Sequence, residues 1–225
     1  MSLWQLLART PNKIPIPGKF MLDQGRNTLD VRLLRGSLLL LMRILFRIEH
    51  HGMENIPSQG PLLIVANHTT YCDPFWISVR IYRAVRFMAW DKIFSYPLAG
   101  RIFRWLGAFP VSLENPESSA LKAALKVLRK GEALMIFPEG GRSPDGNLLP
   151  FKEGAAHLAL KLGATILPVV VHGGVRVWGP KMFFPIPRKV RVEYLPAISP
   201  KEYEDSISGL TQQVRSVIES RLKQV

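Results

Sequence analysis

Short apolar segments of strand length recur along this 225-residue chain, and helical patterns separate them. The predicted strands are residues 61–66, 85–90, 133–137, 164–171 and 189–195. The predicted helices between and after them are residues 73–82, 115–131, 153–163 and 206–225. Because strands that alternate with helices pair mostly in parallel, we predict an α/β fold with a mostly parallel mixed sheet flanked by helices.

Two of the predicted helices carry start signals in the sequence. Asp73 is placed to cap the first of them, with Pro74 at its first helical position. Asn115 and Pro116 have the same two roles in the next helix, and Gly131 suits the left-handed residue at its end. These signals set the predicted helix boundaries.

The N-terminal part of the chain differs from the rest. Residues 1–28 are rich in Pro and Gly, and residues 29–48 form a predicted helix with arginines along one stripe and leucines over much of its remaining surface. Its longest apolar run, residues 38–42, is too short to span a bilayer. We therefore predict an N-terminal amphipathic membrane-associating element, residues 1–50, ahead of an α/β domain, residues 51–225. The alternative is a helix packed on its own domain with a solvated basic face.

The net charge of +13 favours binding partners with an anionic surface. Nucleic acids and anionic lipid headgroups are the two obvious classes of such partners. A diffuse basic surface that serves solubility is the alternative. The single cysteine excludes an internal disulfide and a four-thiolate zinc site, which fits a reducing compartment. The first residues lack a basic region followed by an apolar core, so we expect no secretory signal.

Polar residues gather where three predicted strands end. The segments are NHTTYCDP after strand 61–66, FPEGGRSPDG after strand 133–137 and HGG after strand 164–171. Ligands of open α/β sheets bind at the carboxyl ends of the strands. The first two segments carry His68, Asp73, Glu139 and Arg142, so we predict a polar site at this edge of the sheet.

The pair His68 and Asp73 suits general base catalysis. A neutral imidazole is the usual base near neutral pH, and it needs a neighbour that fixes its tautomer and stabilises the imidazolium. A carboxylate that accepts a hydrogen bond from one ring nitrogen does both. If the substrate brings its own hydroxyl, the pair deprotonates that hydroxyl, which then attacks an acyl carbonyl. The alternative is that Asp73 only caps a helix and that His68 is buried in a satisfied hydrogen bond.

Four segments follow one another in a recognisable order: NHTTYCD at 67–73, GAFPV at 107–111, FPEGGRS at 137–143 and LPVVV at 167–171. Together they resemble the ordered blocks of the glycerolipid (lysophospholipid) acyltransferase superfamily, and most closely its bacterial 1-acylglycerol-3-phosphate acyltransferases. The segment FKEGAAHLA at 151–159 is also similar to the family segment after the third block.

The resemblance implies a glycerol-3-phosphate acyltransferase-like fold and acyl transfer from acyl-CoA or acyl-acyl carrier protein to a lysolipid hydroxyl. The favoured acceptor is 1-acylglycerol-3-phosphate, which would give phosphatidic acid. His68 would be the base, Asp73 its orienting partner, and Arg142 a cation for a phosphate. The implied substrate-binding residues are Asn67, Gly107, Phe109, Phe137, Pro138, Glu139, Gly140, Arg142 and Ser143. No metal is implied, and no organic cofactor beyond the acyl carrier.

Three positions depart from the family pattern. Leu113 stands where the family usually has an arginine for the acceptor phosphate, and Trp90 stands where it often has a lysine, with Lys92 two residues later. Gly141 replaces the commoner threonine of the third block. A different lysolipid, or a lipid hydroxyl with no phosphate beside it, therefore remains an alternative acceptor.

A lysolipid acceptor implies contact with a membrane. Two segments suit an anionic membrane surface: the helix 29–48 and residues 176–191, which combine Lys and Arg with Trp178, Phe183 and Phe184 and contain no acid. The alternative for the second segment is an ordinary loop. We expect a peripheral or monotopic location on the cytoplasmic face of the cell membrane.

Four other functions fit parts of the sequence. Cys72 beside His68 would suit a thioesterase, and the charge alone would suit a nucleic-acid-binding protein, although no nucleic-acid-binding motif is present. His68, Asp73 and Glu139 would suit a metal site, although no paired ligand motif supports one. A non-catalytic protein of the same fold is the fourth alternative.

Overall fold

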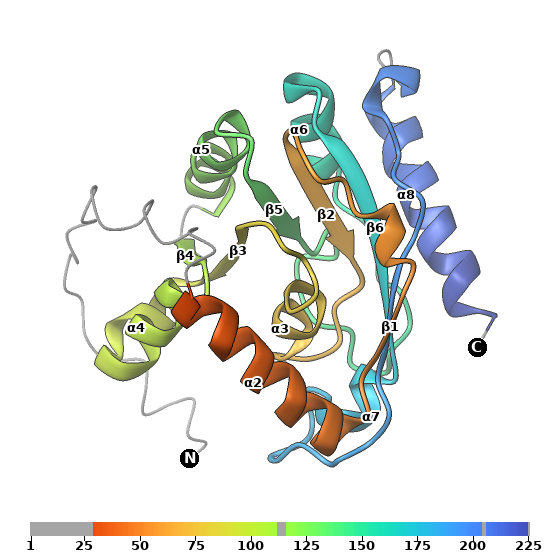
Figure 1. Ribbon diagram of the computed structural model, residues 1–225. Coiled ribbons are helices and arrows are strands. Elements are labelled where there is room, and N and C mark those ends of the chain that lie inside the picture. The colour runs from red at the N-terminus through yellow and green to blue at the C-terminus, as the bar shows by residue number, and fades with distance from the viewer. Residues whose placement is uncertain (1–28, 112–115, 204–205, 225) are drawn as a thin grey trace.

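The computed structural model describes residues 29–111, 116–203 and 206–224, and this part of the chain forms one seven-stranded sheet. The strand order is β1-β7-β6-β2-β5-β3-β4 (Figure 1). The strands are β1 (Glu49–His51), β2 (Leu62–Ala66), β3 (Val85–Trp90), β4 (Ala108–Val111), β5 (Ala133–Ile136), β6 (Thr165–His172) and β7 (Arg191–Tyr194). All five predicted strands are present, and β1 and β4 are additional to them.

The central strand is β2, whose five residues are all buried. It pairs in parallel with β5 on one side and with β6 on the other. The only antiparallel pair among the described strands joins β6 to β7, and β1 pairs in parallel with β7 at one edge of the sheet. The predicted mostly parallel mixed sheet is therefore confirmed. Because helices cover both faces, β2 is an unbroken apolar run instead of an alternating one.

Helices form a layer on each face of the sheet (Figure 1). They are α2 (Leu29–Phe46), α3 (Asp73–Ser78), α4 (Pro97–Trp105), α5 (Pro116–Arg129), α6 (Gly154–Leu162), α7 (Gly174–Trp178) and α8 (Ile207–Leu222), with 3₁₀ turns η1 (Met53–Asn55), η2 (Asp91–Ser95) and η3 (Pro200–Tyr203). One core lies between the sheet and α3, α4 and α7, around the fully buried Trp76. The other lies between the sheet and α5, α6 and α8, where Leu128 and Ile218 are buried.

The first predicted helix is shorter than expected, because α3 ends at Ser78 instead of residue 82. The hydroxyl of Tyr194 donates to the carbonyl of Ile77 at 2.7 Å, which occupies the acceptor that the next helical turn would use. The amide of Ile81 turns to the carbonyl of Ser78 instead. This hydrogen bond from β7 therefore limits the length of α3.

The other predicted helices, 115–131, 153–163 and 206–225, are found as Pro116–Arg129, Gly154–Leu162 and Ile207–Leu222. Ser206 caps α8 by accepting a hydrogen bond from the amide of Gly209 at 2.9 Å, and Gly131 has the left-handed φ of 70°. Pro116 is the first residue of α5. The cap predicted at Asn115 lies outside the described residues, as do residues 1–28.

The predicted basic helix 29–48 corresponds to α2. Phe46 packs edge-on against Trp76, with their ring centroids 6.0 Å apart, so the end of α2 is joined to the core. The sequence boundary placed between residues 50 and 51 falls inside β1, which is part of the sheet. None of the helices in the described ranges is both long enough and apolar enough to cross a lipid bilayer.

Candidate active site

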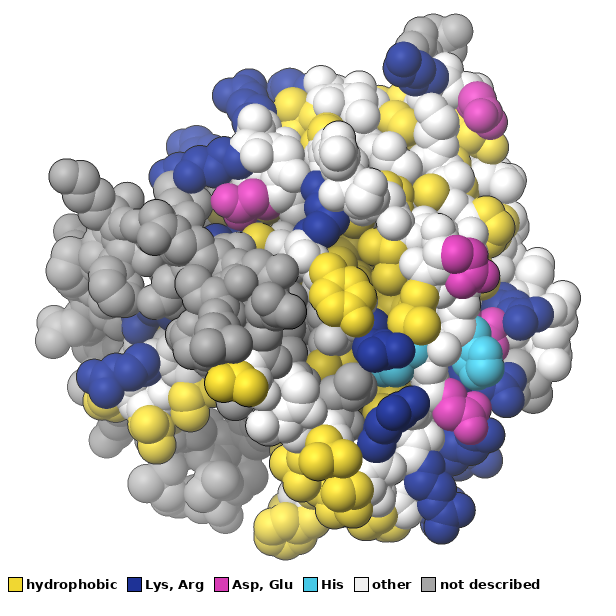
Figure 2. All heavy atoms as spheres, viewed as in Figure 1, with side chains coloured by type: hydrophobic (Ala, Val, Ile, Leu, Met, Phe, Trp, Pro, Cys, Tyr) yellow, Lys and Arg dark blue, Asp and Glu magenta, His cyan; other side chains and the backbone are white. Residues whose placement is uncertain are grey.

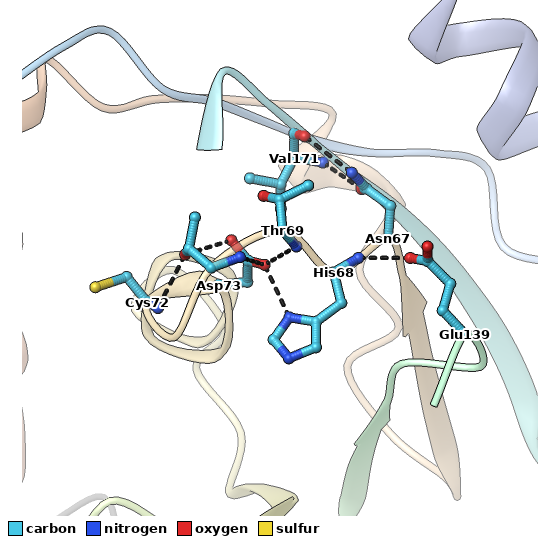
Figure 3. Close-up of polar contacts among 8 residues, drawn as sticks. Asn67, His68, Thr69, Cys72, Asp73, Glu139 and Val171 are labelled. Carbon is cyan, nitrogen blue, oxygen red and sulfur yellow. Dashed lines mark hydrogen bonds and ion pairs between the residues drawn. The ribbon is translucent and has the colours of Figure 1, made fainter. Parts of the chain in front are cut away.

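His68 and Asp73 meet at the carboxyl end of the central strand. His68 lies two residues after β2, and Asp73 is the first residue of α3. The loop between them turns back, so that Nδ1 of His68 lies 2.9 Å from Oδ2 of Asp73 (Figure 3). The side chain of His68 is 18% exposed, whereas that of Asp73 is fully buried. The predicted pair is therefore formed, with the imidazole at the surface and its carboxylate beneath it.

The carboxylate of Asp73 is surrounded by donors from the same loop. Its Oδ2 atom accepts from the amides of Thr69 at 2.6 Å and Thr70 at 2.8 Å, and its Oδ1 atom accepts from the Thr70 hydroxyl at 2.8 Å. All these donors precede α3, and Asp73 is the first residue of the helix itself, so neither the predicted cap at Asp73 nor the alternative that Asp73 only caps the helix is correct. A carboxylate held in this way accepts from Nδ1–H of His68, which leaves Nε2 of the neutral ring without a proton.

The face of the imidazole is covered by Phe137, and its ring edge is left open. The two rings are stacked, with centroids 4.0 Å apart and an interplanar angle of 17°. In Figure 3 the nitrogen that does not bond to Asp73 points away from the carboxylate. No hydrogen-bond partner for this Nε2 atom is present among the side chains and backbone groups that the structure describes. It is available to a substrate hydroxyl.

Glu139 holds the His68 loop through the backbone. Its Oε1 atom accepts from the amide of His68 at 2.7 Å, and its Oε2 atom accepts from the amide of Leu149 at 2.9 Å. Burial raises the pKa of this carboxyl above its ordinary value, although the two backbone hydrogen bonds oppose the shift. A third connection runs from the amide of Ser143 to the carbonyl of His68 at 2.7 Å. The FPEGGRS segment therefore fixes the position of His68.

Arg142 lies at the surface beside this site and contacts Tyr71. The Nη2 atom of Arg142 donates to the Tyr71 hydroxyl at 2.8 Å, and its guanidinium carbon lies 3.5 Å from the centre of the tyrosine ring. Tyr71 also makes an edge contact with Trp178 at the end of α7. The sequence did not indicate Tyr71 as a site residue, although an aromatic residue inside the NHTTYCD segment was a signal for it. Trp178 was predicted only as part of a membrane-contact segment, and its contact with Tyr71 was not foreseen.

The HGG segment begins with the last residue of β6 and brings the start of α7 close to the loop that holds Asp73. A Cβ atom on Gly174 would lie 2.3 Å from the hydroxyl oxygen of Thr69 and 3.4 Å from Oδ1 of Asp73. Only glycine fits at this position, because α7 begins directly against the loop that holds the carboxylate. The third predicted strand end is thus part of the same site, as expected from the sequence.

Three further predicted site residues, Asn67, Pro138 and Gly140, contact other parts of the protein near His68. Asn67 is buried and exchanges two hydrogen bonds with the backbone of Val171, which ties the end of β2 to β6. Pro138 accepts from the amide of Lys152 at 2.9 Å, and Gly140 has a left-handed φ of 71° beside the same lysine side chain. These contacts hold the backbone around His68.

Gly107 and Phe109 are not brought to His68 by contacts in the structure. A Cβ atom on Gly107 would lie 2.4 Å from the carbonyl oxygen of Val85, and its φ is 96°. The ring of Phe109 is buried in the core between the sheet and α5, α6 and α8. Leu113, one of the positions that depart from the family pattern, lies outside the described residues. At another such position, Trp90, the ammonium of Lys92 lies 5.0 Å from the centre of the ring.

The structure disfavours Cys72 as a nucleophile. Burial, together with the charge of Asp73, raises the pKa of its thiol to about 11, so the reactive thiolate is scarce near neutral pH. Its sulfur also points away from the His68 ring (Figure 3). A metal at His68, Asp73 and Glu139 is disfavoured as well, because Nδ1 and all four carboxylate oxygens already take part in hydrogen bonds within the protein.

The fold and the site together define a class of protein. Residues 47–172 match the family model described as Acyltransferase, and they make up more than half of the chain. The chain therefore belongs to the Acyltransferase family, as the sequence resemblance indicated. The match begins just before β1 and ends with the last residue of β6, so it includes the His68 and Asp73 pair.

Individual proteins support the same family. The 1-acyl-sn-glycerol-3-phosphate acyltransferase of Streptococcus pneumoniae is 33% identical over 150 residues, which are 65% of this chain and 55% of that protein. The enzyme of the same name from Limnanthes alba is 29% identical over 174 residues, which are 76% of this chain and 61% of that protein. The chloroplastic BAT2 enzyme of Brassica napus is 32% identical over 131 residues, and this chain spans only 38% of it.

A solved structure confirms the fold. The crystal structure of the 1-acyl-sn-glycerophosphate (LPA) acyltransferase PlsC from Thermotoga maritima superposes with a TM-score of 0.70 at 26% sequence identity. The alignment covers 92% of this chain and 87% of that one. The sheet and its helical layers are therefore those of a known acyltransferase structure.

Proposed function

We propose that this protein is an O-acyltransferase that moves a fatty acyl group from a thioester donor to a hydroxyl of a glycerolipid. The observation that carries the proposal is the geometry of His68, whose Nδ1 atom lies 2.9 Å from the buried carboxylate of Asp73 while its Nε2 atom is open. This arrangement makes a base at the carboxyl edge of the sheet, where α/β folds bind their ligands.

The proposed reaction uses His68, its partner Asp73 and the two substrates. Nε2 of His68 removes the proton from the acceptor hydroxyl as its oxygen attacks the thioester carbonyl, and the Asp73 carboxylate stabilises the imidazolium that forms. The tetrahedral intermediate collapses with cleavage of the carbon–sulfur bond. The departing thiolate takes the proton back from Nε2, so the products are an ester and a free thiol. Base catalysis of this kind contributes about 10²–10⁴-fold to a rate.

The acceptor that we propose is 1-acylglycerol-3-phosphate, with phosphatidic acid as the product. Relatives that carry this substrate in their names support the choice. Arg142 donates a hydrogen bond to Tyr71, which lies in the loop that carries His68, and its guanidinium is the group that we propose pairs with the acceptor phosphate. Leu113 and Trp90 stand where the family usually has basic residues, so another lysolipid is the second candidate acceptor.

The donor is proposed to be acyl-CoA or acyl-acyl carrier protein, and no metal or other cofactor enters the mechanism. Because a long-chain lysolipid lies in a bilayer, we place the enzyme at the anionic cytoplasmic face of the cell membrane as a peripheral or monotopic protein. Its positive charge then serves the lipid surface, and nucleic acid is not proposed as a partner.

The test is a thiol-release assay with a long-chain acyl-CoA or acyl-acyl carrier protein and a panel of lysolipid acceptors. The wild type should release thiol only with an acceptor and form the acylated lipid. His68→Ala should lower the rate by about 10²–10⁴-fold, since it removes the base. His157→Ala is the matched control, because His157 is exposed on α6, and it should retain activity.

Two results would contradict the proposal. The first is release of thiol without an acceptor that persists in His68→Ala. The second is that the folded wild type releases no thiol with any donor and acceptor of the panel. Activity with a phosphate-free lipid, and none with lysophosphatidate, would replace the proposed acceptor and keep the reaction.

A further inference from the structure

An aromatic tip projects from the segment that joins α7 to β7. Phe183 is 90% exposed and Phe184 is 81% exposed, and Ile186 beside them is also exposed. Two neighbouring phenyl rings that bury so little of their surface are unusual in a folded domain, because burial of aromatic groups is one of its main stabilising contributions. We call residues 180–189 the aromatic tip.

The aromatic tip is attached to the domain on both sides of the phenylalanines. The amide of Met182 donates to the carbonyl of Gly179 at 3.0 Å, and the amide of Ile186 donates to the carbonyl of Val177 at 2.8 Å. Residue 190, directly after the tip, is a buried valine. The two rings are therefore held outward by the backbone, instead of lying on a loop without contacts.

Basic residues flank the two phenylalanines in the sequence, and the connecting segment, residues 179–190, contains no acid. Lys181 and Arg188 flank the phenylalanines and are exposed, and neither forms an ion pair within the described part of the chain. Lys189, in contrast, lies 2.8 Å from Glu49 and is partly neutralised. The tip thus presents apolar rings with unpaired positive charges at their sides.

The end of α2 extends this surface. The amide of Val190 donates to the carbonyl of Phe46 at 3.1 Å, so the tip and the last turn of α2 are neighbours (Figure 1). Leu41 and Ile44 of that helix are exposed, and Arg43 between them is exposed as well. In Figure 2, hydrophobic side chains gather near this lower end of α2, with Lys and Arg beside them.

The tip is also connected to the candidate active site. Trp178, two residues before the tip, makes an edge contact with Tyr71, whose ring centroid is 5.9 Å away. Tyr71 in turn lies under the guanidinium of Arg142. A surface that receives the tip would therefore also lie close to the open edge of the site.

We infer that the aromatic tip is a membrane anchor: Phe183 and Phe184 enter the acyl-chain boundary of an anionic bilayer while Lys181 and Arg188 contact the lipid phosphates. In such a bilayer the acyl chains lie beneath a layer of negative headgroups. The apolar rings suit the acyl-chain layer, and the basic side chains beside them, with no acid nearby in the sequence, suit the headgroup layer. Long basic side chains reach the headgroups while the segment beneath them sits deeper. The inference extends the proposed function, since it names the surface that brings the lipid acceptor to the site.

The first test is co-sedimentation of the full chain with vesicles of phosphatidylcholine alone or mixed with phosphatidylglycerol. The wild type should bind the anionic vesicles more tightly. Phe183→Ser with Phe184→Ser, and separately Lys181→Gln with Arg188→Gln, should each weaken this binding about tenfold or more. Tyr82→Ser is the matched control, because Tyr82 is 76% exposed and lies before β3, away from the carboxyl edge, and it should bind like the wild type.

A second measurement reads the tip directly. In a Cys72→Ala background, a polarity-sensitive fluorophore attached through Phe184→Cys should shift to the blue with anionic vesicles, and the same fluorophore attached through Tyr82→Cys should not. Equal vesicle binding by the Phe183 and Phe184 double variant, with an unshifted probe at position 184, would overturn the inference. A second contrary result is possible: the wild type self-associates in lipid-free solution, the double variant does not, and both bind vesicles equally. The tip would then be a protein interface, and the membrane-anchor inference would be overturned.

These readouts separate the anchor from the reaction. If the wild type proves inactive in acyl transfer but the tip still controls vesicle binding, the anchor stands and the proposed function fails. If acyl transfer is present but the tip variants bind vesicles and acylate bilayer-embedded lysolipid like the wild type, the proposed function stands and the anchor is refuted.

Discussion

The guanidinium of Arg142 rests on the ring of Tyr71, with its central carbon 3.5 Å from the ring centre and one N–H bonded to the phenol oxygen. An arginine held in this way loses less side-chain entropy when it binds a phosphate, because its position is already restricted. Tyr71 is thus a positioning residue for the proposed acceptor site, acting through Arg142.

Tyr71→Phe should raise the KM for a phosphate-bearing acceptor by about threefold to tenfold, which corresponds to the net value of one hydrogen bond. The kcat should change little, since the base is untouched. Steady-state kinetics with 1-acylglycerol-3-phosphate and with a phosphate-free acceptor provide the test, and the second KM should stay constant. A lower KM with the phosphate acceptor would mean that Tyr71 competes with the phosphate.

Asp73→Asn separates the charge of the buried partner from its hydrogen bonds. The asparagine oxygen can take the place of Oδ2 and accept from Thr69, Thr70 and His68, while its amide donates to the Thr70 hydroxyl. The melting temperature should therefore change little, but kcat should fall by about 10²–10⁴-fold because the imidazolium loses its counter-charge. An unchanged kcat in this variant would argue against His68 as the base.

Cys72→Ala should retain acyltransferase activity. With a pKa of about 11, only about one thiol in ten thousand is ionised at pH 7, so the wild-type thiol should also react slowly with iodoacetamide. The alkylation rate and the activity of the alkylated protein are the measurements. Rapid alkylation that abolishes activity, together with an inactive alanine variant, would revive the thioesterase alternative.

Gly174→Ala should destabilise the protein and inactivate it, because the added methyl group would overlap the Thr69 hydroxyl at 2.3 Å in the loop that holds Asp73. Gly141→Ala is the control, since a Cβ atom there meets nothing within 4 Å. Thermal melts and activity assays of the two variants compare the positions. Equal behaviour of both would show that α7 does not constrain the site.

Acid should destabilise the protein partly through Glu193, which is buried on β7. Burial alone would raise its pKa, but the hydrogen bond and charge of Arg221, with the charges of His172 and Arg191, lower it overall from its ordinary value of 4.5. A carboxyl with a lowered folded-state pKa stabilises the fold fully above the unfolded pKa, and this contribution is lost as the pH falls below about 4.5.

The free energy of unfolding of the wild type should thus drop more between pH 7 and pH 3 than that of Glu193→Gln. The difference should be about 1 kcal/mol, because the Arg221 side chain is partly exposed and solvent screens the pair. Urea titrations at both pH values provide the measurement. Parallel losses in the two proteins would show that Glu193 contributes nothing to acid sensitivity.

The sequence predicted the sheet well because its strands are continuous apolar runs, and it predicted the His68 and Asp73 pair because both lie next to the end of one such run. It did not predict β1, which has only three residues and includes two histidines. It also gave no sign that the Glu139 carboxylate accepts from two backbone amides that lie far apart in the sequence. Hydrogen bonds between distant loops leave no periodic signal, and neither do the contacts of Tyr71 and Trp178.

The pairing of β2 on both sides has a consequence for how the site behaves over time. Because β2 is hydrogen-bonded to two neighbours and buried on both faces, we expect its amides to exchange with solvent only when the whole domain opens. His68 follows such a strand by two residues, so its backbone is joined to the slowest-opening part of the protein. Asp73 is the first residue of α3 and is held by the amides of Thr69 and Thr70 in the loop that follows β2. We therefore expect the distance between His68 and Asp73 to stay nearly constant while the helices of the outer layers fluctuate.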